Sequence, residues 1–228
     1  MAEQDMVRYS DRAEAGALLA AGAEGHLGRV DLVVGAARGG VVVAAPVAAT
    51  LAVPLDVRVV RKLGAPGQPE RAIGAVTPEG VVRWLEGEPL LPEPAMRTVL
   101  LDACAREARE REALYRSEVP RLSVSGLRVL LVDDGVATGA TVMALVEGLR
   151  REGAAAVLLT LPVAPPETAA LLEPSVEGMW IPHQPQGLWA VGMAYENFRT
   201  VTDLEVLACL REARSRQEGP SSRPPEAA

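Results

Sequence analysis

The stretch that decides the fold runs Val129-Leu130-Leu131-Val132-Asp133-Asp134-Gly135-Val136-Ala137-Thr138-Gly139-Ala140-Thr141. Its apolar start predicts a fully buried strand, and its small residues predict a turn that opens a helix. Gly135 and Gly139 let the backbone approach a ligand closely. The first N–H groups of the helix form an anion site, and the paired carboxylates lie beside it. The segment therefore suits a ligand that carries both a phosphate and a vicinal diol.

This pattern resembles the PRPP-binding motif of the type I phosphoribosyltransferases, with an apolar strand, two acids and a small-residue loop ending in Thr-Gly-x-Thr. The resemblance implies that Asp133 and Asp134 hold the ribose hydroxyls of PRPP. It also implies that residues 137–141 cradle the 5′-phosphate. The implied fold class is α/β, an open and mostly parallel sheet flanked by helices.

Three other interpretations of the stretch stay open. It could be a buried strand–helix unit with a tight turn, although an unpartnered Asp pair would be costly there. A Rossmann turn lacks support because the G-x-G-x-x-G spacing is missing. A phospho-receiver domain would need a phosphoacceptor Asp on a later strand, and no Asp lies between Asp134 and Asp203.

A second strand–loop–helix unit precedes this one. Residues 31–35 predict the first buried strand, residues 36–40 a glycine-containing turn, and residues 41–52 a helix with Pro46 in its second turn. An earlier helix, capped at Ser10, is expected to run to Ala21. In the family that the chain resembles, the loop after the first core strand binds the pyrophosphate of PRPP, which implies roles for Ala37, Arg38 and Gly39.

Basic residues follow the next predicted strand, residues 54–60, at Arg61 and Lys62. Ligands of open parallel sheets bind at the carboxyl ends of the strands, so we expect both to approach the diphosphate. Residues 64–120 then interrupt the strand–helix rhythm with a loop over 65–70, a hairpin around 78–80 and a helix over 95–116. We interpret them as an inserted cap, the place of the family's flexible catalytic loop. Its candidates to reach the site are Arg109, Tyr115 and Arg116.

The C-terminal part holds an aromatic cluster in a chain with only 3% aromatic residues. Trp189 and Tyr195 are either a packing patch or a platform for a flat acceptor. Similar enzymes place the acceptor under a small C-terminal hood, and a bacterial branch of unassigned acceptor specificity carries such a segment together with Arg61-Lys62-Leu63-Gly64. The predicted core is therefore 1–63 with 121–205, and residues 212–228 are expected to be a disordered tail.

The composition limits the expected binding partners and cellular location of the protein. A net charge of −7 argues against nonspecific nucleic-acid binding. No long uncharged apolar run predicts a membrane span, and the charged N-terminus does not resemble a signal peptide. Cys104 and Cys209 show no pairing pattern, so we expect a reduced, cytoplasmic setting. A homo-oligomer is compatible with the family resemblance.

Together these features predict a Mg²⁺-dependent phosphoribosyltransferase that moves the phosphoribosyl group from PRPP to a small nitrogenous acceptor, expected to be a nucleobase, and releases pyrophosphate. The alternatives are a PRPP-sensing regulator without transferase activity and a diphosphokinase, for which no ATP motif is found. The expected catalytic groups are Arg38, Lys62 and the two acids, with Asp133 and Asp134 also holding Mg²⁺ directly or through water. The expected PRPP-binding residues are Ala37, Arg38, Gly39, Arg61, Lys62, Asp133, Asp134, Gly135, Ala137, Thr138, Gly139, Ala140 and Thr141, and the expected acceptor-binding residues are Trp189 and Tyr195.

Overall fold

The computed structural model describes residues 8–85 and 87–218. A parallel sheet of five strands forms its centre, in the order β2-β1-β6-β7-β8. The bounds are β1 Leu32–Ala36, β2 Leu55–Arg58, β6 Arg128–Val132, β7 Ala156–Thr160 and β8 Gly178–Trp180. This confirms the predicted open α/β sheet flanked by helices.

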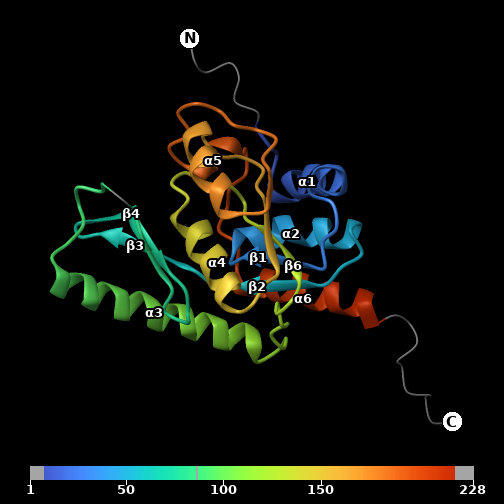
Figure 1. Cartoon of the computed structure of the whole chain (residues 1–228), viewed down its shortest axis with the longest axis horizontal. Helices are drawn as coiled ribbons and strands as arrows, with labels where there is room; N and C mark the ends of the chain where they lie inside the picture. The colour runs from blue at the N-terminus through green and yellow to red at the C-terminus, as the bar shows by residue number, and fades with distance from the viewer. Residues whose placement is uncertain (1–7, 86, 219–228) are drawn as a thin grey trace.

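Helices cover both faces of this sheet (Figure 1). One face carries α1 (Arg12–Leu27), α2 (Gly39–Thr50) and α6 (Asp203–Glu218), and the other carries α4 (Ala140–Arg151) and α5 (Pro166–Leu172). Successive side chains of β6 alternate between the two layers: Leu130 and Val132 join the first core, whereas Val129 and Leu131 join the second. Burial on both faces explains why this strand is a continuous apolar run.

The inserted region is a second unit with its own sheet. The strands β3 (Arg61–Ala65), β4 (Gln68–Val76) and β5 (Val82–Trp84) form an antiparallel sheet in the order β3-β4-β5. The helix α3 (Pro94–Arg116) packs against it around Leu63 and Ile73. In Figure 1 this unit, hereafter the wing (residues 61–116), projects to one side of the core.

The structure corrects several predicted boundaries. Arg61 and Lys62 do not end the second core strand; they begin β3, because β2 stops at Arg58 and the chain turns into the wing. Residues 68–70, expected in a loop, already belong to β4. The cap of α1 is Asp11 rather than Ser10, because the Asp11 carboxylate accepts from the N–H groups of Ala13 and Glu14.

The predicted end of α1 at Ala21 was also wrong, and the helix continues to Leu27. Gly22 does not terminate it. A Cβ at Gly22 would lie 1.9 Å from Trp180, so this glycine makes room for the indole that packs on the helix.

The C-terminus differs from the prediction in part. Residues 212–218, expected to be disordered, form the last turns of α6, which buries Val206, Leu207 and Leu210 against the sheet. The remainder of the predicted tail, 219–228, lies outside the described residues. No helix in the described part of the chain is long and apolar enough to cross a membrane.

Candidate functional site

Two loops meet at the carboxyl edge of the central sheet. β1 and β6 are paired neighbours, with Gly35 opposite Val132, so the loops that follow them lie side by side. The first loop leads from Ala36 into α2 and contains a cis peptide bond between Ala37 and Arg38. The second begins with Asp133 and leads into α4. The structure thus brings the two predicted loops together.

Glycines bring these loops into direct contact. A Cβ at Gly40 would lie 2.7 Å from the Val132 carbonyl oxygen and 2.9 Å from Asp133 Oδ1. A Cβ at Gly39 would lie 1.9 Å from Asp134 Oδ2. Because glycine lacks that atom, the acidic pair rests on the first turn of α2.

The second loop has the form of an anion cradle. Gly135 (φ +135°) and Gly139 (φ +81°) both adopt conformations that side-chain-bearing residues rarely take. No side chain caps α4 within the described residues, so its first-turn N–H groups remain available to an anion. The Thr168 hydroxyl donates to the Ala137 carbonyl oxygen at 2.7 Å and fixes the loop from behind. Thr138 is exposed, and Thr141 is half-buried on the first turn of α4.

The two acids have different surroundings. Asp133 Oδ1 accepts from the Asp134 N–H at 2.8 Å. Burial raises the pKa of Asp133 well above its usual range, the charge of Asp134 adds to this shift, and the charge of Lys62 opposes it. Lys62 is therefore close enough to act on the acidic pair. Asp134 forms a direct ion pair, because its Oδ2 lies 2.7 Å from Arg12 Nε.

The other predicted cations have acidic partners outside the Asp133–Asp134 pair. Arg61 pairs with Glu107 of α3 at 2.5 Å, on the side of β3 opposite to its neighbour Lys62. Arg38 Nη1 lies 4.0 Å from the Asp203 carboxylate at the start of α6. The charge of Lys62 therefore acts on the acidic pair, whereas the guanidinium of Arg61 is paired with Glu107.

Two wing candidates are occupied by structural contacts. Tyr115 is fully buried and its hydroxyl donates to Asp203 Oδ1 at 2.5 Å, so it does not reach into the site. Arg116 donates to Oδ1 of Asp56, a residue of β2, at 2.7 Å. Arg109 is exposed on α3, and its predicted role stays a prediction.

The aromatic cluster divides into two parts. Tyr195 is only 5% exposed; it packs between Tyr9 and Phe198, and its hydroxyl donates to the Asp134 carbonyl oxygen at 2.6 Å. As the side chain lies, it supports the acidic turn and offers no open face for stacking, which corrects the predicted platform. Trp189 is 85% exposed, and its predicted acceptor role stays a prediction.

Sequence reasoning missed two contributors to this region. Arg12 gave no signal beyond its place near the start of a predicted helix. Asp203, by contrast, lies inside Thr202-Asp203-Leu204-Glu205, a capping box that marks the start of α6.

Comparisons with known proteins agree with this geometry. Residues 13–179 match the family described as "Phosphoribosyl transferase domain". Two Mycobacterium tuberculosis proteins (strains CDC 1551 / Oshkosh and H37Rv), each named "Putative phosphoribosyl transferase", are 38% identical over 217 residues, which cover 91% of this chain and 47% of each relative. The chain thus spans about half the length of these relatives. The crystal structure of TT1426 from Thermus thermophilus is 39% identical, with a TM-score of 0.74 over 90% of this chain and 99% of that one. The chain belongs to the type I phosphoribosyltransferase family.

Proposed function

We propose that this protein transfers the 5-phosphoribosyl group from PRPP to a small nitrogenous acceptor and releases pyrophosphate. The observation that carries the proposal is the contact between the two loops. The acidic pair rests directly on Gly39 and Gly40 of the first loop, beside an uncapped helix start that suits a phosphate. A sugar that bears a phosphate at one end and a diphosphate at the other matches this layout.

Each part of the site has a role in that reaction. Cleavage of the anomeric C–O bond develops positive charge on the ribose and negative charge on the leaving diphosphate. In the proposal, the N–H groups of residues 137–141 hold the 5′-phosphate, and Asp133 and Asp134 orient the ribose hydroxyls. Lys62 and the start of α2 face the diphosphate and stabilise its growing charge.

Mg²⁺ fits the donor chemistry of the site, because carboxylate oxygens are the hard ligands that this ion prefers. No group of three His, Cys, Asp or Glu residues that could hold a metal ion occurs within residues 8–85 and 87–218. Asp133 and Asp134 would therefore hold the ion only together with PRPP oxygens and water. When bound, it would neutralise charge on the diphosphate.

The acceptor is proposed to approach from the side of the hood, the segment 182–200 between β8 and α6. The exposed indole of Trp189 is the candidate surface there for stacking a flat base. A nucleobase remains the expected class of acceptor, and a cytoplasmic setting remains the expected location.

The test is a panel of nucleobases with PRPP and Mg²⁺, followed by the release of pyrophosphate. At least one base should give turnover, and Asp133→Asn with Asp134→Asn should abolish it, because the ribose hydroxyls lose both carboxylates. Full turnover by the double variant would contradict the assignment. PRPP binding without pyrophosphate release from any base would favour the alternative, a PRPP-sensing regulator.

A further inference from the structure

Arg12, the first residue of α1, makes its main contacts far along the chain. Its Nε donates to Asp134 Oδ2 at 2.7 Å, and its Nη1 donates to the Arg199 carbonyl oxygen at 2.8 Å. The side chains of Arg12 and Asp134 are only 10% and 15% exposed. This is a largely buried ion pair, which is retained only where geometry and additional hydrogen bonds compensate for desolvation.

Aromatic side chains complete the surroundings of the guanidinium. Its central carbon lies 3.9 Å from the centre of the Phe198 ring and 5.9 Å from that of Tyr195. A flat guanidinium can stack on a ring and donate in two directions at once, whereas a lysine ammonium cannot reproduce both features. The contacts of Arg12 thus use properties that are specific to arginine.

The pair also touches the first loop, which leads from β1 into α2 and is proposed to bind the diphosphate. A Cβ at Gly39 would lie 1.9 Å from Asp134 Oδ2 and 2.7 Å from Arg12 Nε, so both charged groups pack on this glycine. The turn is held on another side by the Tyr195 hydroxyl, which donates to the Asp134 carbonyl oxygen at 2.6 Å. Asp134 is therefore fixed by α1, by the start of α2 and by the C-terminal hood.

We propose that Arg12 is a positioning residue of the PRPP site, which holds Asp134 against the first loop and ties it to the hood. The inference rests on the proposed PRPP-dependent function. Arg12 engages Oδ2 and leaves Oδ1 to accept a hydrogen bond from a ribose hydroxyl. Through Arg199, the same side chain links the ribose subsite to the segment that faces the acceptor.

The experiment measures PRPP affinity by titration calorimetry with Mg²⁺ and without an acceptor. Arg12→Met removes the ion pair and should weaken PRPP binding at least about tenfold, because Asp134 loses its buried partner. Arg12→Lys keeps the charge but loses the bond to Arg199, and should bind about threefold or more weakly than the wild type. Arg29→Met is the matched control, because Arg29 is 81% exposed and pairs with Asp31 at the surface; it should bind PRPP as the wild type does.

Thermal unfolding shows which variants are folded. If Arg12→Met does not fold, the PRPP affinity of Arg12→Lys alone tests the inference. Affinities of folded Arg12→Met and Arg12→Lys within twofold of the wild type would overturn the inference and leave the proposed function intact. A wild-type protein that does not bind PRPP would overturn both.

Discussion

Tyr195 supports the turn at Asp134 without presenting an open ring face. Its hydroxyl donates to the backbone carbonyl of Asp134, and its ring is covered by neighbouring aromatics. Sequence reasoning recognised that this aromatic residue matters, yet could not say which way it points. That direction depends on packing between segments that are far apart in the chain.

Replacing Tyr195 by Phe should lower the free energy of unfolding by about 1 kcal/mol, because one buried hydrogen bond is lost. The Asp134 backbone should then be less well fixed, so the KM for PRPP should rise. Unfolding curves and steady-state kinetics check both effects.

Tyr9→Phe is the matched control, because the Tyr9 hydroxyl donates to the Pro162 carbonyl oxygen at 3.0 Å and not to either residue of the acidic pair. It should cost similar stability but leave the KM unchanged. If the KM for PRPP of Tyr195→Phe equals that of Tyr9→Phe, a supporting role for Tyr195 is contradicted.

At the level of elements, the strands and helices of the core were predictable because burial leaves clear patterns in the sequence. Residues 129–132 and 156–159 are apolar runs that lie between two helical layers. The long helix of the wing was also found, from its charged and apolar periodicity. The pairing of strands could not be predicted. β3 pairs with β4 in a separate sheet instead of extending the central one, and the local sequence pattern does not determine such a pairing.

The helix α6 was missed although its start carries a local signal. Glu205 accepts from the Thr202 N–H at 2.9 Å, and the Thr202 hydroxyl accepts from the Glu205 N–H at 3.2 Å. Hydrogen bonds from Arg199, and then from Thr202, lower the pKa of Glu205 to about 2. The cap therefore depends on an ionised Glu205.

This cap predicts a pH-dependent contribution to stability. A carboxyl whose pKa is lower in the folded state stabilises above its unfolded pKa of about 4.5 and loses that contribution as the pH falls toward about 2. Glu205→Gln should therefore be less stable than the wild type at pH 6, and the difference should shrink on acidification. Denaturant unfolding between pH 6 and pH 3 measures it.

Glu212→Gln serves as the control for α6, because Glu212 is 73% exposed and pairs with Arg216 on the solvent side. The free energy of unfolding of this variant should differ little from that of the wild type between pH 6 and pH 3. If the loss of unfolding free energy in Glu205→Gln is the same at every pH, the role of the ionised cap is contradicted.

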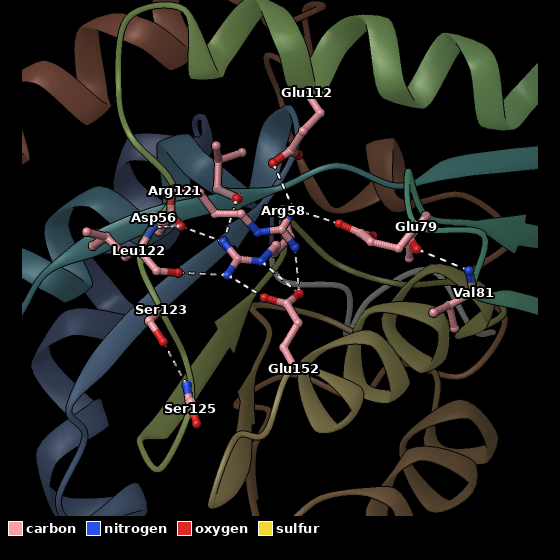
Figure 2. A network of polar contacts seen from close by, with 12 residues as sticks. Asp56, Arg58, Glu79, Val81, Glu112, Arg121, Leu122, Ser123, Ser125 and Glu152 are labelled. Atoms are coloured by element: carbon pink, nitrogen blue, oxygen red, sulfur yellow. Dashed lines mark hydrogen bonds and ion pairs between the residues drawn. The ribbon is translucent and has the colours of Figure 1, made fainter.

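At the level of the whole molecule, a polar network joins the wing to the core (Figure 2). Asp56 of β2 is fully buried and accepts from Arg58, from Arg116 Nη1 at 2.7 Å and from the Leu122 N–H at 3.0 Å. Glu152, at the end of α4, binds Arg58 and Arg121. The network therefore fixes α3 relative to the sheet that carries the site.

Asp56→Asn should destabilise the protein by about 3–5 kcal/mol, because two largely buried guanidinium groups lose their shared counter-charge. Denaturant unfolding measures the change. Arg214→Gln, which removes an exposed pair with Glu218 on α6, should change stability by less than about 0.5 kcal/mol. Equal effects of the two substitutions would show that the network does not stabilise the fold.

The candidate site was predictable to the extent that it is local in sequence. The loops at residues 133–141 and 37–39 could be located because each follows a buried strand and opens a helix, while their roles stay predictions. The ion pairs of Arg61 with α3 and of Asp134 with Arg12 could not be predicted. Each joins residues that are at least 46 positions apart in the sequence.

The most direct test of the central claim is a crystal structure of the protein with PRPP and Mg²⁺. The 5′-phosphate should lie on the N–H groups of residues 137–141, and the ribose hydroxyls should lie within hydrogen-bonding distance of Asp133 and Asp134. A ligand bound elsewhere, or an acidic pair that contacts no part of the sugar, would contradict the account.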